Sequence, residues 1–391
     1  MRLLHTGDWH LGKRLYGADR AEEAEAVLAQ LAGLAEEEAV DAVVVSGDLL
    51  DRRVVDSAAL GACLRALERL AETAPVLAVA GNHDDPDLWT HLAPHLAASG
   101  IHVAGHVRSA AEAVVTVPTA AGPLHAALLP WPDPARIALD AGASAGYARS
   151  RYADLVADVI DDYAAEAEGR RRAEGGAAVL VGHLMVERAR AGGGERELTM
   201  GMTYAVSPGA LPLGLDYLAL GHVHRPQEIT GLAAPGRYCG SPIALDFSED
   251  NHPKTACLVE VGGGRATSRQ VALEAARPLV RLRGPLDDLA ALASAHPDAW
   301  FACEVELDGP AMDVVHRVRE AVPGALRIEA LSPGGPGGAS PEPGGAEAER
   351  GLGELYADWH RLQGRPLRDE QAAAFAAALA GSDPAAAGDE G

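Results

Sequence analysis

The sequence has 391 residues, 48% of them hydrophobic, which is enough to bury one large core with smaller additions. Its net charge is −23, from 33 basic and 56 acidic residues, which excludes a protein that grips nucleic acid through an extensively basic surface. Four cysteines without a C-x-x-C pair exclude a zinc ribbon and a disulfide scaffold. Because no apolar run is long enough for a signal peptide or a membrane span, we predict a cytoplasmic protein with no membrane contact.

Five apolar runs of strand length each meet a glycine and a residue that could bind a metal ion: RLLHTGDWH, AVVVSGDLL, PVLAVAGNHDD, AAVLVGHLM and YLALGHVH. Helix-like segments are predicted between some of them, at 21–38 and 57–72. In α/β sheets such residues collect at the carboxyl edge of the strands, so we expect them to converge. The predicted metal ligands are Asp8, His10, Asp48, Asn82, His183, His222 and His224.

The residue types and their spacing indicate a centre with two metal ions. Glycine lets the backbone approach an ion closely, and the D-x-H and H-x-H spacings put two side chains on one side of an extended loop. If Asp48 bridges, two ions receive four ligands each, and mixed imidazole and carboxylate ligands favour Mn, Fe, Co or Zn. Each motif alone is more often a turn or a hydrogen-bonded loop, but independent turns have no reason to use only ligand types. Such a centre would attract and hydrolyse a phosphodiester without a basic surface.

His83 follows the predicted ligand Asn82, so an extended backbone would turn its side chain toward bound substrate. We predict that it protonates the leaving oxygen or stabilises the charge that develops there, with Asp84 orienting its imidazole. The next residues, 85–89, read DPDLW and predict the start of a helix with a capping carboxylate.

Basic residues follow several of these motifs, and they are candidates for binding the substrate. The alternative is that they are solvated loop charges of the kind any surface carries. The candidates are Lys13, Arg14, Arg52, Arg53 and Arg225.

The ordered series D-x-H, GD, GNHD, GH and GHVH resembles the calcineurin-like metallophosphoesterases, and the segments MRLLHTGDWHLGKRLYG, VDAVVVSGDLLDR, DYLALGHVHRPQ and RYCGSPIALDFSE resemble their bacterial SbcD branch. The resemblance implies a four-layer α/β/β/α core and two divalent metal ions, usually Mn²⁺. Asp8, His10 and His224 would hold one ion, and Asn82, His183 and His222 the other. Asp48 would lie between the ions, and His83 would be the catalytic histidine.

The chain after residue 272 has a different composition. We predict a metallophosphoesterase core at 1–272, a small α+β capping domain at 273–332, a Gly- and Pro-rich flexible linker at 333–349 and a helical segment with a tail at 350–391. The helical segment carries an apolar stripe that would dock on a partner or fold back on the chain itself. The stripe consists of Leu352, Leu355, Tyr356, Trp359 and Leu362.

From the resemblance we expect an exonuclease and endonuclease that cleaves DNA ends and hairpins in DNA repair, recombination and replication. It would act with the SMC-like ATPase SbcC, whose coiled-coil base would receive the apolar stripe, and as a homodimer within a heterotetramer. Two alternatives remain open: a small-molecule (cyclic nucleotide) phosphodiesterase, and a DNA-end scaffold that does not cut.

Overall fold

The computed structural model describes residues 1–140, 145–190, 204–212, 214–232, 234–249, 253–262, 265–307 and 313–331, and single positions between 367 and 375. The predicted linker and the predicted partner-binding residues Leu352, Leu355, Tyr356, Trp359 and Leu362 lie outside the described residues. Residues 1–331 form one unit. No helix in the described part of the chain is both long and apolar enough to cross a bilayer.

The first sheet has six strands in the order β14-β13-β1-β2-β3-β4. The strands β1 to β4 run parallel, and β13 pairs antiparallel with β1. Three of the predicted apolar runs form β1, β2 and β3, whose side chains are almost all buried, as expected for strands covered on both faces. The bounds are β1 (Arg2–Thr6), β2 (Ala42–Val45), β3 (Val76–Val79), β4 (Ile101–Ala104), β13 (Thr255–Gly262) and β14 (Arg265–Ala272).

The second sheet also has six strands, in the order β11-β12-β10-β7-β6-β5. Its centre is parallel, from β6 through β7 and β10 to β12, and the strands β5 and β11 pair antiparallel at the two edges. The other two predicted apolar runs form β7 and β10. The bounds are β5 (Val114–Thr119), β6 (Gly122–Leu129), β7 (Ala177–His183), β10 (Tyr217–Gly221), β11 (Gln227–Glu228) and β12 (Gly236–Tyr238).

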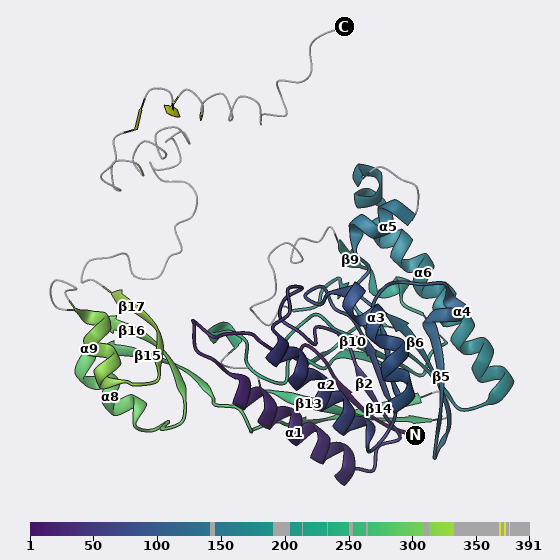
Figure 1. The fold of residues 1–391 in the computed structure, drawn as a ribbon, viewed down its shortest axis with the longest axis horizontal. Helices are drawn as coiled ribbons and strands as arrows, with labels where there is room; N and C mark the ends of the chain where they lie inside the picture. Colours follow the sequence, from purple (N-terminus) through teal and green to yellow (C-terminus); the bar gives the residue numbers. More distant parts are fainter. Residues whose placement is uncertain are drawn as a thin grey trace, which may run out of the picture. The chain divides into compact units, whose positions relative to one another are not determined.

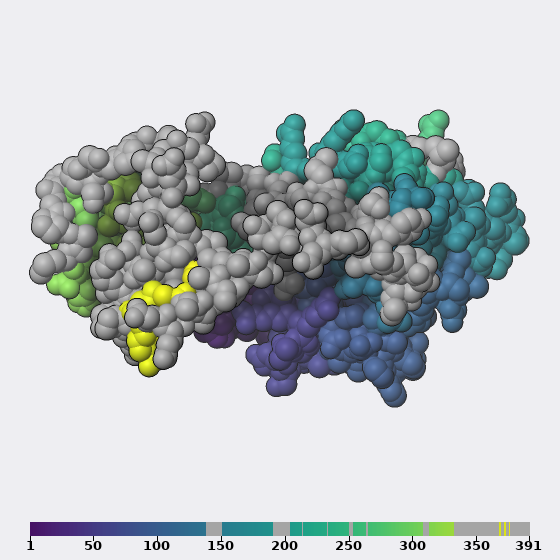
Figure 2. All heavy atoms as spheres, turned by 90° about the horizontal axis from the view of Figure 1, so that it is seen from above, coloured from purple at the N-terminus to yellow at the C-terminus, as the bar shows by residue number. Residues whose placement is uncertain are grey.

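Helices cover the outer faces of both sheets (Figure 1). Helices α1 (Ala21–Glu37) and α2 (Ser57–Ala71) and the helix α3 (Pro86–Leu96) pack on the first sheet, and α6 (Ala145–Glu174) packs on the second. A third apolar cluster lies between the sheets and draws residues from both, for example Val44 and Val181. The predicted four-layer α/β/β/α core is therefore confirmed. In Figure 2, seen from above, the purple and blue early residues lie on one side and teal later residues on the other.

Shorter elements complete the core, and the predicted start of α3 is confirmed. Asp85 caps this helix, because its side chain accepts from the backbone N–H groups of Asp87 and Leu88 at 3.0 and 3.4 Å. The shorter elements are α4 (Ala110–Ala113), α5 (Pro134–Asp140), β8 (Met185–Val186), β9 (Ala205–Val206) and the 3₁₀ turns η1 (Ala97–Ser99), η3 (Pro208–Ala210) and η4 (Phe247–Glu249).

The strands and helices expected after residue 277 form a small unit in which they alternate, so it is α/β and not α+β as predicted. Its three strands are parallel, in the order β15-β16-β17, with helices α8 and α9 in the two crossovers. Where it meets the core, Leu15 and Phe247 pack with Leu279 and Ala302, and the indole N–H of Trp300 donates to Glu23 at 2.8 Å. The bounds are β15 (Leu279–Pro285), α8 (Leu286–Ala293), β16 (Trp300–Glu306), α9 (Val314–Ala321) and β17 (Ala325–Leu331).

Candidate metal centre

The seven predicted ligands come together at the carboxyl edge of the two sheets, and all seven are buried. The first sheet supplies four of them from the loops after β1, β2 and β3. The second sheet supplies the other three from the end of β7 and the loop after β10. Residues that are up to 216 positions apart in the chain, Asp8 and His224, thus belong to one cluster with His10.

Tight turns hold these side chains in place. Four ligands, Asp8, His10, Asp48 and His222, have positive φ angles of 52°, 47°, 47° and 101°, which cost energy in residues other than glycine. The neighbouring glycines allow close contact between the loops. A Cβ at Gly221 would lie 2.0 Å from the carbonyl oxygen of Ser46.

One group of ligand atoms is centred on His10 and His224. Their Nε2 atoms are 3.2 Å apart, and the Nε2 of His10 lies 3.4 Å from Oδ2 of Asp48. Asp8 lies in the same cluster, and its Oδ2 is buried without a hydrogen bond to any of the described residues. A buried carboxylate oxygen without a donor is stabilised by a cation, so this group fits a metal ion.

A second group is centred on Asn82. Its Oδ1 lies 3.0 Å from Nε2 of His183 and 2.9 Å from Nδ1 of His222. Asp48 Oδ2 lies 3.4 Å from Nε2 of His183, the same distance that separates it from Nε2 of His10. Neighbouring ligands of an octahedral ion with ~2.1 Å bonds are about 3 Å apart. Both groups therefore have the spacing of a metal shell, and Asp48 is placed between them.

Polar partners orient the ligand histidines from behind. The Nδ1–H of His183 donates to the carbonyl oxygen of Ser46 at 2.8 Å, which leaves its Nε2 free for an ion. His224 Nδ1 lies 3.1 Å from Oε1 of Glu249, and His10 Nδ1 lies 3.4 Å from Oδ1 of Asp51. Imidazole rings held in this way present a fixed nitrogen to a metal.

Burial and neighbouring charges shift the pKa values at this edge in both directions, and burial lowers the pKa of His10 to about 4. Burial lowers the pKa of His183, but the carboxylates of Asp48 and Asp8 and its hydrogen bonds raise it to about 9. Burial raises the pKa of Asp8 to about 6. For Asp48, the facing His183 and His10 outweigh burial and hold the pKa well below its usual value. Positive charge beside Asp48 is thus favoured, in agreement with the ligand spacing.

His83 lies beside the centre, and its ring makes an edge contact with the ring of His10 at 4.6 Å between centroids. Its backbone N–H donates to Asp48 Oδ1, and its Nδ1–H donates to the carbonyl oxygen of Asp51, both at 2.8 Å. The hydrogen bond to Asp51 directs the Nε2 of His83 away from that loop.

Asp84 has partners that the sequence did not suggest. Its carboxylate accepts from the backbone N–H groups of Leu49, Leu50 and Gly81, at 3.1, 2.9 and 2.8 Å. It therefore ties the loop that carries Asp48 to the loop that carries Asn82. Burial raises its pKa to about 7, with the charge of Asp48 adding to the effect.

The five predicted substrate-binding residues lie on loops around the centre. Lys13 and Arg52 lie 3.4 and 3.5 Å from the carboxylate of Asp51, and Arg53 lies 3.4 Å from that of Asp133. Arg14 donates to the carbonyl oxygen of Gly17 and is largely exposed. Arg225, half-buried, directly follows His224.

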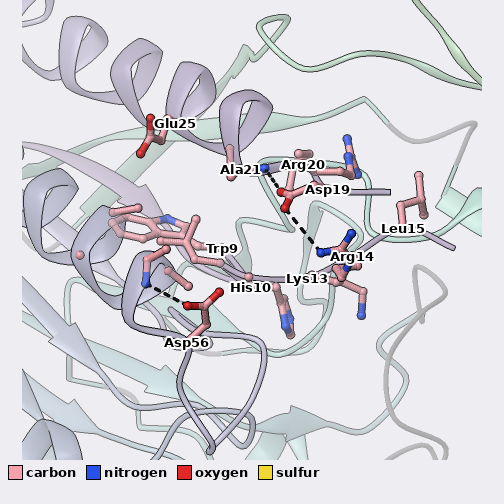
Figure 3. A pocket seen from close by; sticks show the side chains of 18 of the residues that line it. Trp9, His10, Lys13, Arg14, Leu15, Asp19, Arg20, Ala21, Glu25 and Asp56 are labelled. Carbon is pink, nitrogen blue, oxygen red and sulfur yellow. Dashed lines mark hydrogen bonds and ion pairs between the residues drawn. The ribbon is translucent and has the colours of Figure 1, made fainter. Parts of the chain in front are cut away.

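Lys13 and Arg14 also line a cavity of about 350 Å³ between the loop 9–20 and helices α1 and α2. Figure 3 shows Trp9 and His10 in the wall of this cavity, with Lys13 and Arg14 beyond His10. The first ligand loop is thus reached by solvent from the side of the helices.

Four supporting residues were not predicted: Asp51, Glu249, Ser46 and Trp131. Two of them carry a signal in the sequence, because Asp51 ends the motif GDLLD and Glu249 lies in DFSED. Trp131 follows the end of β6, and its ring stacks on His222 with centroids 5.2 Å apart and planes at 26°.

Comparison with known proteins gives matches along most of the chain. A family model described as calcineurin-like phosphoesterase matches residues 1–226, and one described as type 5 capsule protein repressor C-terminal domain matches residues 275–355. The chain is 33% identical to the SbcD subunit of the nuclease SbcCD from Bacillus subtilis (strain 168) over 341 residues, 84% of this chain and 85% of the relative. It is 31% identical to the SbcD subunit of the nuclease SbcCD from Escherichia coli (strain K12) over 344 residues, 85% of this chain and 84% of the relative.

Proposed function

The chain belongs to the calcineurin-like phosphoesterases and, within them, to the SbcD family of nuclease subunits, and from this membership we propose that it is a metal-dependent nuclease that cleaves DNA ends and hairpins. The membership agrees with the resemblance found in the sequence. The observation that carries the proposal is the position of Asp48, whose Oδ2 is 3.4 Å from a nitrogen of each ligand group.

In the proposed centre, Asp8, His10 and His224 would hold one ion and Asn82, His183 and His222 the other, with Asp48 shared between the two groups. Two divalent ions supply Lewis acidity for attack on a phosphodiester and neutralise its charge. The mixed imidazole, carboxylate and amide ligands suit Mn, Fe, Co or Zn, and among these we favour Mn²⁺ because the family resemblance implies it. Asp51, Glu249 and the carbonyl of Ser46 keep the ligand rings in the required orientation.

His83 is the proposed catalytic residue. Its Nδ1–H donates to the carbonyl of Asp51, so Nε2 is the nitrogen that would hold a proton for the leaving oxygen or stabilise charge on the phosphate. Asp84 fits the role of a positioning residue, because its three backbone hydrogen bonds fix the loops that present Asp48 and Asn82.

Substrate and partner complete the proposal. Lys13, Arg14, Arg52, Arg53 and Arg225 are proposed to contact the DNA backbone near the centre. We further propose that an SbcC-type ATPase supplies most of the grip on DNA, since this chain carries a net charge of −23. The partner would bind the stripe with Leu352 and Trp359, in a heterotetramer with two copies of this chain. A cytoplasmic location is proposed because the four cysteines are free and buried, as thiols are in a reducing compartment.

The test is to incubate the purified chain with Mn²⁺ and a hairpin-ended duplex, with and without the ATPase partner. We expect cleavage by the wild type, a loss of roughly 10²- to 10⁴-fold for His83→Ala, and no cleavage by Asp8→Ala. Leu292→Ala, an exposed change on α8, is the control that should cut normally. Equal activity in all variants would contradict the mechanism, and turnover of cyclic nucleotides without DNA cleavage would favour a small-molecule phosphodiesterase.

A further inference from the structure

Trp131 is fixed against the second group of metal ligands. Its ring stacks on His222 and makes an edge contact with His183 at 6.2 Å between centroids. Its backbone N–H donates to the carbonyl oxygen of Ala80 at 2.9 Å, which ties it to the loop that carries Asn82. An indole in this place is an aromatic surface next to the position where the scissile phosphate must bind.

The same indole lines a cavity of about 360 Å³ that the metal ligands themselves do not line. Gly81, at the start of the Asn82 loop, borders the cavity on the side of the centre, and Pro86, Val107 and Ile137 supply apolar walls. A group bound here would therefore be adjacent to the centre without touching the ions.

Charged residues around this cavity neutralise one another. Arg53 lies 3.4 Å from Asp133, and His106 lies 2.8 Å from Asp87. A phosphate inside the cavity would lie beside the carboxylates of Asp87 and Asp133 as well as the guanidinium groups of Arg53 and Arg136, so the cavity favours an anion less than the metal centre does. It favours a flat, uncharged group with polar edges. The indole and the apolar walls can pack on the faces of such a group, while the charged side chains lie at its edges.

A nucleobase is the group of that kind that accompanies a phosphodiester in DNA. We propose that this cavity binds the base of a nucleotide next to the scissile phosphate, stacked on Trp131. The proposal rests on the nuclease function proposed above and specifies its substrate. A base inside a duplex is stacked on both sides, so entry into the cavity requires that the nucleotide be unpaired, as in a single strand, a hairpin loop or a frayed end.

The experiment measures kcat/KM in the presence of Mn²⁺ on three single-stranded oligonucleotides and compares the values as ratios. One oligonucleotide has all its bases. The other two each carry one abasic nucleotide, either immediately 5′ or immediately 3′ of the bond that is cut in the intact oligonucleotide. For the wild type we expect the intact substrate to be cut roughly ten- to a hundredfold more efficiently than one of the abasic substrates, the range expected for one stacked base.

Three variants test whether Trp131 and the cavity cause this preference. Trp131→Ala should bring the ratio to about one, and Trp131→Phe, which keeps an aromatic ring, should restore most of it. Ile137→Trp, which fills the cavity and leaves Trp131 in place, should also bring the ratio to about one. Leu292→Ala is the matched control and should keep the wild-type ratio.

The outcomes separate this proposal from the nuclease function. If the wild type cuts DNA but both abasic substrates are cut as well as the intact one, the base-binding cavity is refuted and the nuclease stands. The same holds if Trp131→Ala lowers cleavage of intact and abasic substrates equally, because the indole would then only support His222. If the wild type cuts no DNA with Mn²⁺, the proposed function itself fails.

Discussion

Two regions of the molecule differ in backbone strain and in what they bury. One is the edge of the sheets that carries the candidate centre, and the other is the small unit at 279–331. At the edge, Asp8, His10, Asp48 and His222 have positive φ, and charged or polar side chains are buried side by side. Among the described residues of the small unit, only Asp313 has positive φ outside glycine, and the buried side chains are all apolar. One region accepts strain and buried charge to place ligand atoms, whereas the other is stabilised by ordinary apolar packing.

The largest expected effect comes from removing one charge from the edge. Asp48→Asn keeps the size of the side chain but weakens the oxygen placed between the two ligand groups, so we expect DNA cleavage to fall by roughly a thousandfold or more. Calorimetric titration with Mn²⁺ should show weaker binding. The same acid-to-amide change in the small unit, Glu304→Gln, should leave both measurements unchanged; if Asp48→Asn behaves like it, the bridging role is wrong.

The close packing of the loops at this edge should not tolerate an added methyl group. Gly221→Ala would place a Cβ 2.0 Å from the carbonyl oxygen of Ser46, which also binds His183. We expect a loss of about 1–3 kcal/mol in the free energy of unfolding, measured by urea denaturation. Gly262→Ala, at the end of β13 with no atom within 4 Å, is the control. Equal stability of the two variants would show that the loops at the edge can move apart freely.

Acid should destabilise the core just below the centre. His5 is fully buried, with Nδ1 3.0 Å from the Tyr217 hydroxyl and Nε2 3.2 Å from Oγ of Ser46. Burial, and then the charge of Arg237, lower its pKa from 6.5 to about 3, so the folded protein keeps it neutral while the unfolded chain takes up a proton below pH 6.5. This contribution to stability is complete above pH 6.5 and is lost as the pH falls toward 3, by about 2 kcal/mol at pH 5.

Urea denaturation at pH 7 and pH 5 measures this loss. His5→Gln should reduce the difference between the two pH values by about 2 kcal/mol, although it lowers stability at pH 7. His316→Gln changes an exposed histidine of the small unit and should leave the difference as it is. An unchanged difference in His5→Gln would mean that His5 is protonated in the folded protein.

The smallest expected effect is a gain in stability from a substitution in the small unit. Asp313 has φ of 56° at the start of α9, where its side chain makes no capping hydrogen bond. Asp313→Gly should raise the free energy of unfolding by about 0.5 kcal/mol, since glycine adopts this conformation without strain. DNA cleavage should not change. A loss of stability would show that the Asp313 side chain supports α9 after all.

The convergence of the seven proposed ligands could be predicted because five of them directly follow a glycine at the end of an apolar strand, and this local pattern does not depend on which strands are neighbours in the sheets. Contacts between distant segments could not be predicted in the same way. Glu249 reaches His224 only because η4 folds back on the loop after β10, and Trp131 reaches His222 only because β6 and β10 flank β7. The pairing of β13 with β1 could not be predicted either, because neither strand's sequence indicates which strand it pairs with.

The expectation for Asp84 shows the limit of reasoning from sequence neighbours. Adjacency to His83 suggested that the carboxylate would act on the imidazole, yet the chain turns between them and the three amides of Leu49, Leu50 and Gly81 surround it. Backbone donors carry no signature in the sequence, so their partners emerge only from the fold.

The stretch of backbone that presents Asp8 and His10 continues to Leu15, which is wedged with Phe247 against Leu279 and Ala302 of the small unit. This segment, residues 8–15, thus carries proposed metal ligands at one end and contacts the small unit at the other. Because Leu15 is only five residues after His10, a change in the packing of the small unit would act on the same segment that carries the first two proposed ligands.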